Sequence, residues 1–223
     1  MMRKILNNIP ERVRVLFFWP IFGAVFWCME LIGTDNYHNV HCFLDDKIPF
    51  CEYFVIPYYF WFIFLMGMVI YGFFWDETAL KNYMKFTAIT YTVTLFIYAV
   101  YPTAQDLRPV SFESDSFFTQ IVRFAYKVDT NTNVCPSIHV LGSMAVYFAA
   151  RKSRVFGKMV WRVAFCATAV LITLSTLFIK QHSVLDVVFA VILGVAVYPF
   201  VYKKDKNPQN PAQTKENYTY INQ

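Results

Sequence analysis

Long apolar runs separated by short polar segments cover most of the chain. Six of these runs come close to the ~20 residues that an α-helix needs to cross a ~30 Å hydrocarbon core. The fourth is the shortest, but its small residues Gly142, Ala145 and Ala149 recur at helical spacing, which favours close packing against other helices. The pattern therefore predicts an all-α protein, a six-transmembrane helix bundle formed by a single domain, 1–223. The predicted spans are Val15–Gly33, Tyr53–Trp75, Tyr83–Tyr101, Ser137–Ala150, Met159–Ile179 and Ser183–Tyr202.

Two segments outside the predicted spans have patterns of their own. In 112–127 the apolar residues Phe117, Ile121 and Phe124 share one helical face and polar residues take the other. This spacing predicts an amphipathic helix that lies in the membrane interface, in the outer loop between spans three and four. The polar, proline-containing segment 203–223 predicts a disordered tail.

The composition excludes most soluble proteins. Of the 223 residues, 57% are hydrophobic and only 16% are charged, whereas soluble domains average roughly 25% charged residues. The 24 Phe, 15 Tyr and 5 Trp also provide far too much apolar surface for an intrinsically disordered chain. The sequence therefore predicts a multi-pass integral membrane protein whose main partner is the lipid bilayer.

The basic residues are distributed unevenly between the two ends of the predicted bundle. Fifteen of the 20 Lys and Arg residues lie in the N-terminal segment, in the segments 76–85 and 151–162, and in the C-terminal tail, and five lie in the other loops. By the positive-inside rule, this asymmetry predicts a protein of the cell membrane with both termini in the cytoplasm. The loops after spans one, three and five are then outside. The same distribution explains the net charge of +5 without a nucleic-acid partner.

Ionisable residues gather near the span ends and not at mid-membrane, where a coupled transporter would need them. Three polar segments are predicted to meet on the outer face. Gln105–Pro109 follows span three, Pro136–His139 opens span four, and His182–Asp186 opens span six. The predicted topology therefore brings two helix N-termini and a loop arginine to one membrane surface.

The residue types in these segments favour phosphoryl transfer. The free N–H groups of the helical turn that begins at Ser137 form a natural phosphate site, and Arg108 can add a bidentate guanidinium fork. His182 and Asp186 are four residues apart and share a helical face, so the carboxylate can hold one ring nitrogen protonated while the other acts as a nucleophile. His139 supplies a second imidazole that can protonate a leaving oxygen. The set predicts a phosphohistidine intermediate and no metal.

These segments resemble the phosphatidic acid phosphatase type 2 superfamily, whose pattern is Lys-x6-Arg-Pro, then Pro-Ser-x-His, then Ser-Arg-x5-His-x3-Asp. The second part stands unaltered at 136–139. The first part corresponds to 101–109, with Tyr101 in place of lysine, and the third to 175–186, with Thr176 in place of arginine. The three motifs occur in the family's order and at one predicted membrane face.

The resemblance implies a six-span membrane phosphatase fold and a role for each matching residue. His182 would be the nucleophile, Asp186 its orienting partner, and His139 the acid that protonates the leaving group. The phosphate would be held by four further side chains, two of them standing in for the missing cations: Arg108, Ser137, Lys180 and Tyr101. The substrate would be a membrane lipid phosphate or diphosphate, hydrolysed at the outer leaflet without a metal or another cofactor.

Two other functions fit the same residues. The loss of the family cations at Tyr101 and Thr176 brings the chain closer to lipid phosphotransferases that resemble inositol phosphorylceramide and sphingomyelin synthases. Those enzymes pass the phosphoryl headgroup to an alcohol instead of water. The same loss fits a catalytically silent lipid-binding membrane protein of the same fold.

The candidate residues also have purely structural explanations. His182 and Asp186 can form a helix-cap pair, and Ser137 can simply cap span four. Arg108 can anchor a lipid headgroup, and Lys180 can be a cation that flanks a span. These explanations and the catalytic one make different demands on where the side chains point.

The outer loop after span one carries further histidines and cysteines. Cys42 and Cys51 share this loop, where a disulfide is allowed but not demanded by the sequence. His38, His41 and Cys42 match no closed zinc pattern. The sequence therefore predicts no metal site in this loop.

Overall fold

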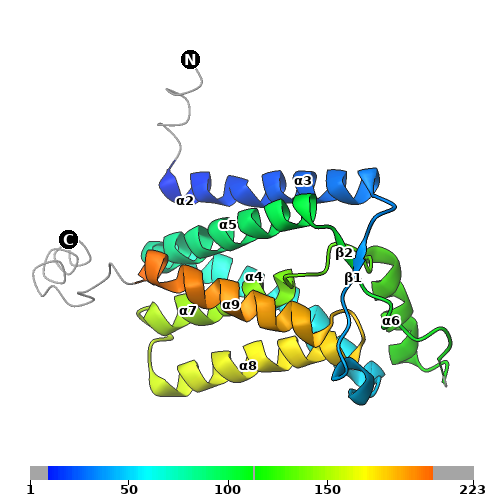
Figure 1. Ribbon diagram of the computed structural model, residues 1–223. Coiled ribbons are helices and arrows are strands. Elements are labelled where there is room, and N and C mark those ends of the chain that lie inside the picture. The colour runs from blue at the N-terminus through cyan, green and yellow to red at the C-terminus, as the bar shows by residue number, and fades with distance from the viewer. Residues whose placement is uncertain (1–9, 113, 203–223) are drawn as a thin grey trace, which may run out of the picture.

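The structure is a computed structural model, and it describes residues 10–112 and 114–202. The chain runs back and forth between the two ends of a helix bundle, with two short strands and a separate helix at one end (Figure 1). The predicted tail, 203–223, lies outside the described residues. The elements in chain order are α2 (Glu11–Arg14), the 3₁₀ helix η1 (Val15–Phe17), α3 (Phe18–Ile32), β1 (His38–Asn39), η2 (Asp45–Lys47), η3 (Glu52–Phe54), α4 (Val55–Phe74), α5 (Glu77–Val100), β2 (Thr103–Ala104), α6 (Phe117–Val128), α7 (Ile138–Lys152), α8 (Met159–Phe178) and α9 (Val184–Tyr202).

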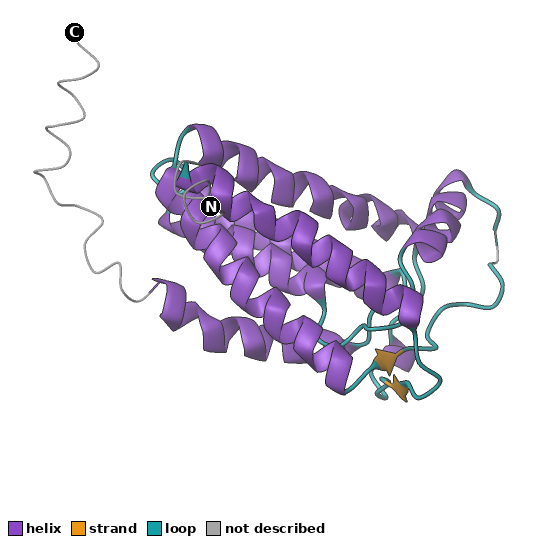
Figure 2. Ribbon diagram, turned by 90° about the horizontal axis from the view of Figure 1, so that it is seen from above, coloured by secondary structure: helices purple, strands orange, loops and turns teal. Residues whose placement is uncertain are grey.

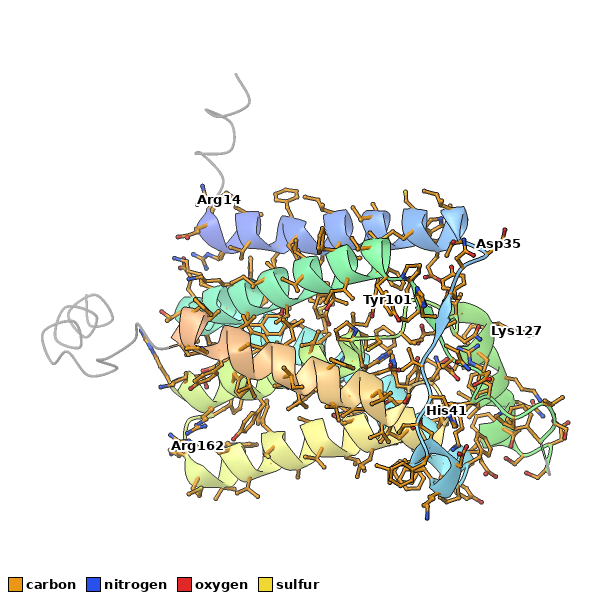
Figure 3. All side chains as sticks on the ribbon, in the orientation of Figure 1. Arg14, Asp35, His41, Tyr101, Lys127 and Arg162 are labelled. Atoms are coloured by element: carbon orange, nitrogen blue, oxygen red, sulfur yellow. The ribbon has the colours of Figure 1, made fainter. Side chains whose placement is uncertain are left out.

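One end of the bundle, called the loop end below, carries β1, β2, α6 and the turn between α8 and α9 (Figures 1 and 2). The strands β1 and β2 pair in parallel and tie the segment after α3 to the segment after α5. The opposite end carries the start of α2 and the end of α9. Figure 3 shows Arg14 and Arg162 at this opposite end, and His41 and Lys127 at the loop end. The loops after predicted spans one, three and five therefore lie together.

Helices of membrane-crossing length make up most of the bundle. Many of their outward-facing side chains are large and apolar, among them the exposed Ile21, Ile63 and Phe96. Because soluble proteins rarely expose so large an apolar surface to water, the chain is built as a membrane protein. Within the described residues, five segments are long and apolar enough to cross a membrane: Glu11–Ile32, Glu52–Phe74, Glu77–Val100, Met159–Phe178 and Val184–Tyr202.

The segment predicted as the fourth span forms the helix α7, which is shorter than each of the five segments named above. Its 15 residues extend about 22 Å at a rise of ~1.5 Å per residue, less than a ~30 Å hydrocarbon core. The helix packs against α4, α5, α8 and α9 in the centre of the bundle. The predicted close packing is confirmed at Gly142, where a Cβ atom would lie 2.6 Å from the hydroxyl of Tyr91. Ala145 and Ala149 are fully buried.

The amphipathic helix predicted within 112–127 is present as α6, which runs across the loop end of the bundle (Figure 1). Its Val122 and Ala125 are buried against the bundle. Two residues of the predicted apolar face, Phe117 and Phe124, are exposed. The helix therefore packs through the neighbouring face and leaves two aromatic rings on the surface.

Asp76, in the turn between α4 and α5, joins three segments at the opposite end. Its carboxylate caps α5 by accepting a hydrogen bond from the N–H of Ala79 (3.0 Å), and it accepts another from the N–H of Arg154 (3.0 Å) in the turn after α7. We expect Asp76→Ala to lower the free energy of unfolding by about 1–3 kcal/mol, because both N–H groups lose their acceptor. Thermal unfolding in detergent measures the effect, with the exposed Asp35→Ala as control. Equal Tm values for Asp76→Ala and wild type would contradict this role.

Candidate active site

His182 lies in the turn between α8 and α9, and Asp186 lies in the first turn of α9. The Oδ2 atom of Asp186 is 3.0 Å from Nδ1 of His182 and accepts a hydrogen bond from the N–H of Ser183 at 2.9 Å. Both side chains are buried, Asp186 completely. A buried carboxylate at Nδ1 places the ring proton on that nitrogen and leaves Nε2 with its free electron pair. The predicted pairing of the two residues is confirmed.

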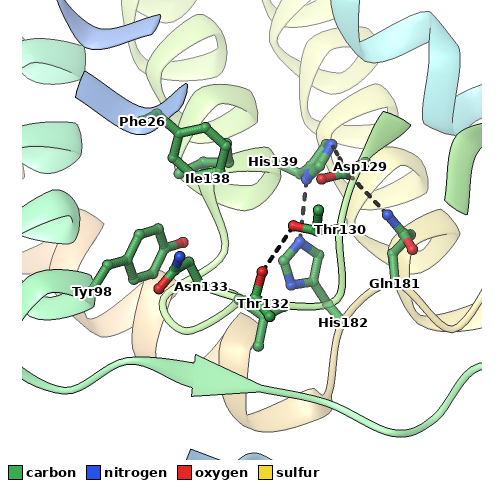
Figure 4. A pocket seen from close by; sticks show the side chains of 11 residues that line it. Phe26, Tyr98, Asp129, Thr130, Thr132, Asn133, Ile138, His139, Gln181 and His182 are labelled. Carbon is green, nitrogen blue, oxygen red and sulfur yellow. Dashed lines mark hydrogen bonds and ion pairs between the residues drawn. The ribbon is translucent and has the colours of Figure 1, made fainter. Parts of the chain in front are cut away.

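His182 meets His139 at the loop end of the bundle. His139 lies in the first turn of α7, which Ser137 caps as the sequence predicted. Its Nδ1 atom is 3.2 Å from Nε2 of His182 (Figure 4). The His139 ring also packs against the rings of Tyr58 and Trp61, with centroid separations of 4.9 Å and 4.5 Å. The two imidazoles that the sequence predicted to share a pocket are therefore in direct contact.

A second carboxylate, which the sequence analysis missed, faces the other nitrogen of His139. The Oδ2 atom of Asp129 lies 3.9 Å from Nε2 of His139. It accepts hydrogen bonds from Nε2 of Gln181 (2.9 Å) and from the hydroxyl of Tyr58. Figure 4 shows Asp129, His139 and Gln181 meeting from different segments. No spacing rule points to Asp129, whose one sequence signal is its place in the loop before the Pro-Ser-x-His motif.

A small cavity lies beside the two histidines (Figure 4). Its volume of about 10 Å³ admits a single water molecule. The loop 130–133 forms part of its wall. The carboxylate of Glu30, at the end of α3, accepts hydrogen bonds from the hydroxyls of Thr130 and Thr132 and from the side-chain amide of Asn133. Glu30 therefore ties this loop to α3.

Arg108 reaches the same region, but its guanidinium binds backbone carbonyls. Nη1 donates to the carbonyl of Tyr126 at 3.0 Å and Nη2 to the carbonyl of Asp129 at 2.6 Å. The guanidinium also lies over the Tyr126 ring, 4.4 Å from its centroid. Burial lowers the pKa of the Arg108 guanidinium. The negative charge of Asp129 partly offsets this lowering. Arg108 thus stabilises the C-terminal end of α6, and it is not among the residues that line the cavity.

Lys180 also binds backbone and not the histidines. Its Nζ atom donates to the carbonyls of Asp45 (2.7 Å) and Ile48 (2.6 Å), and burial lowers the pKa of its ammonium group. The Asp45 carboxylate accepts hydrogen bonds from the hydroxyl of Ser183 (2.6 Å) and the N–H of Val184 (2.8 Å). The hydrogen bonds of Lys180 and Asp45 therefore fix the turn between α8 and α9 to the loop after β1. This arrangement fits the explanation of Lys180 as a flanking cation, because its ammonium group points to backbone carbonyls and away from the histidines.

Tyr101 and Thr176, which stand where the resembled pattern has a cation, do not place their side chains against the rings of His139 or His182. Tyr101, just after α5, is exposed and stacks on His38, with ring centroids 3.9 Å apart. The residue that lines the cavity is Tyr98, one turn earlier, which donates a hydrogen bond to the carbonyl of Pro136 at 2.6 Å. Thr176 is buried in α8, and its carbonyl accepts hydrogen bonds from two N–H groups of the following turn. Thr176 therefore has a structural role at the end of α8.

The cysteines of the loop after α3 are both free. The N–H of Cys42 donates to the Asp45 carboxylate at 2.8 Å, and the N–H of Cys51 donates to the carbonyl of Phe178 at 3.0 Å. The disulfide that the sequence left open is therefore not formed here. In the described part of the chain, no three His, Cys, Asp or Glu side chains are grouped so that they could hold a metal ion.

The comparisons with known proteins gave no relative. No family model matches the chain, and the comparisons with curated proteins and with solved structures found no match. The resemblance to the phosphatidic acid phosphatase type 2 superfamily therefore rests on the sequence motifs. Of these, the structure brings the Pro-Ser-x-His and His-x3-Asp segments into contact, and it directs the arginine of the first motif elsewhere.

Proposed function

We propose that this protein hydrolyses a lipid phosphate or lipid diphosphate at a membrane surface through a phosphohistidine on His182. The observation that carries the proposal is the row Asp186–His182–His139 at one end of a bundle of membrane-length helices. The carboxylate leaves Nε2 of His182 unprotonated and nucleophilic, and His139 stands beside it as the proton donor. A lipid whose tails lie in the bilayer presents its phosphate at such an end.

Two steps complete the reaction. In the first, Nε2 of His182 gives its electron pair to phosphorus, the bond from phosphorus to the leaving oxygen breaks, and that oxygen takes the proton from Nδ1 of His139. In the second, a water oxygen attacks phosphorus, the phosphorus–nitrogen bond breaks, and the water gives one proton to His139. Both histidines are thereby restored. The charge of Asp186 stabilises the positive ring of the phosphohistidine.

The two rings must part before this reaction. An in-line transfer places the phosphate between the attacking nitrogen and the proton donor, which requires about 7 Å between them. Nε2 of His182 and Nδ1 of His139 are 3.2 Å apart, and a cavity of about 10 Å³ is too small for phosphate. Substrate entry therefore requires the two rings to separate and the cavity beside them to widen.

The proposal includes a membrane orientation. We assign α7 as the sixth span, its short length being accommodated by the protein that surrounds it. The basic residues at the opposite end, Arg14 and Arg162 among them (Figure 3), support a cytoplasmic position for that end. The loop end, with α6 in the interface, is then extracytoplasmic in the cell membrane, and so is the active site.

One observation favours the two alternative functions. None of the described residues that line the cavity is Lys or Arg, because Arg108 and Lys180 bind backbone carbonyls. A site with so little positive charge holds a phosphodiester, with one negative charge, at lower electrostatic cost than a phosphomonoester with two. This supports a lipid phosphotransferase, which takes a diester headgroup. A site that binds the lipid without reacting is the catalytically silent case.

One assay separates the three functions. The purified protein in nanodiscs, with EDTA present, is expected to release phosphate from at least one member of a panel of phosphatidate, phosphatidylglycerol phosphate and an isoprenoid diphosphate. Vanadate, an analogue of the phosphoryl transition state, is expected to inhibit it. Transfer of label from a phospholipid headgroup to an added alcohol would instead identify the phosphotransferase. Absence of both phosphate release and headgroup transfer would support the catalytically silent lipid-binding protein.

A further inference from the structure

Asp129 faces the ring of His139, as Asp186 faces the ring of His182. The row of contacts runs from Oδ2 of Asp129 to Nε2 of His139 (3.9 Å), from Nδ1 of His139 to Nε2 of His182 (3.2 Å), and from Nδ1 of His182 to Oδ2 of Asp186 (3.0 Å). Figure 4 shows its first two contacts. Each imidazole therefore has one carboxylate and one imidazole as neighbours.

The Asp129 side chain is held in this position from several elements. Tyr58 of α4 and Gln181 of the turn after α8 both donate hydrogen bonds to Oδ2, the atom that faces His139. Arg108, from the loop after β2, holds the main-chain carbonyl of Asp129 at 2.6 Å. The carboxylate is thus fixed by tertiary contacts and is not a freely rotating surface group.

The hydrogen-bond roles along the row show what this carboxylate favours. Because Asp186 keeps the His182 proton on Nδ1, Nε2 of His182 accepts a hydrogen bond and Nδ1 of His139 donates it. A carboxylate that faces Nε2 of His139 is then stabilising when that nitrogen carries a proton too. His139 with protons on both nitrogens is the form that a general acid needs before the leaving group departs.

We propose that Asp129 is a positioning residue for His139, whose ring it aligns and whose protonated form it stabilises. The inference rests on the proposed phosphoryl transfer, in which His139 is the acid. The other groups around the His139 ring do not duplicate this role, since the facing rings of α4 are neutral and His182 is itself the nucleophile. The titratable and charged groups that face His139, element by element, are Tyr58 of α4, Asp129 after α6 with Arg108 at its carbonyl, and His182 with Asp186 behind it.

The variant Asp129→Asn tests the charge and keeps the shape, because the amide oxygen still accepts hydrogen bonds from Tyr58 and Gln181. We expect kcat for a short-chain alkyl phosphate to fall about 10- to 100-fold, and kcat for p-nitrophenyl phosphate to fall about threefold or less. The two losses differ because p-nitrophenolate can leave without being protonated, whereas an alkoxide leaving group must receive a proton from the acid as it departs. The alkaline limb of the pH–activity profile should move to lower pH, and Asp129→Glu should restore part of the activity.

A second readout does not depend on activity. ¹⁵N NMR of His139 in nanodiscs should show, throughout a pH titration, a smaller share of doubly protonated rings in Asp129→Asn than in wild type. Asp115→Asn is the matched control, since this exposed carboxylate pairs with Arg123 and is remote from the row; it should change neither readout. Equal losses on both substrates with unchanged His139 protonation would overturn the inference. If wild type transfers no phosphoryl group, the proposed function fails, and the titration alone decides whether Asp129 acts on His139.

Discussion

Replacement of His182 by alanine is expected to abolish phosphate release, lowering kcat by at least about four orders of magnitude. In the proposed reaction this variant removes the nitrogen that forms the bond to phosphorus, and no other side chain in the row has a ring nitrogen whose far side is fixed by a buried carboxylate. Phosphate release from the best lipid of the panel measures the loss. The acid-labile labelled phosphoenzyme, trapped by rapid quenching of wild type, should be missing from His182→Ala.

His41→Ala is the control for this experiment. His41 is also at the loop end, but it is partly exposed, pairs with Asp46 at 2.9 Å, and does not line the cavity beside His139. Its substitution should leave phosphate release and the phosphoenzyme unchanged. A His182→Ala protein that still accumulates the labelled intermediate would show that another residue is the nucleophile.

His139→Ala is expected to lower kcat for an alkyl phosphate by about 10²- to 10⁴-fold. The leaving oxygen then departs without a proton, and the attacking water of the second step loses its base. The phosphoenzyme should form slowly and, once formed, decay slowly, which single-turnover measurements resolve. His182 keeps its contact with Asp186 in this variant, so the proposed nucleophile is still present.

His139→Gln distinguishes the lost proton donor from lost packing. Glutamine fills much of the space between Tyr58 and Trp61 but cannot act as an acid at neutral pH, so it should be as inactive as alanine. Near-normal turnover in His139→Gln would contradict the acid role. If Asp129 acts through His139, adding Asp129→Asn to His139→Ala should cost little more, because effects within one unit are not additive.

The local features of this chain were predictable from sequence. The helix positions follow from apolar runs of membrane length, and α4, α5, α7, α8 and α9 lie close to the predicted spans. The capping role of Ser137 and the pairing of His182 with Asp186 depend on residues within one helical turn. Such contacts are fixed by helix geometry alone, which is why spacing reveals them.

The cations illustrate what spacing did not reveal. Lys180 lies two residues before His182, Arg108 lies in the loop after span three, and residue type made both of them candidate phosphate ligands. Their side chains instead satisfy carbonyls at the end of α6 and in the loop after β1. A long side chain can reach several partners from one backbone position, and the fold decides which acceptors are within reach.

The sequence by itself determined the helices, their apolar surfaces, the helix cap at Ser137 and the His182–Asp186 pair, since each of these depends on neighbours in the chain. The predicted topology placed His139 and His182 on one face, but only the tertiary structure decided that their rings are in contact, that Asp129 faces His139, and that Glu30 holds the loop beside them. These contacts join residues that are distant in the chain. They exist because α4 packs against α7, α3 packs against α5, and the segments between the helices meet at the loop end. No periodicity in the sequence records that packing.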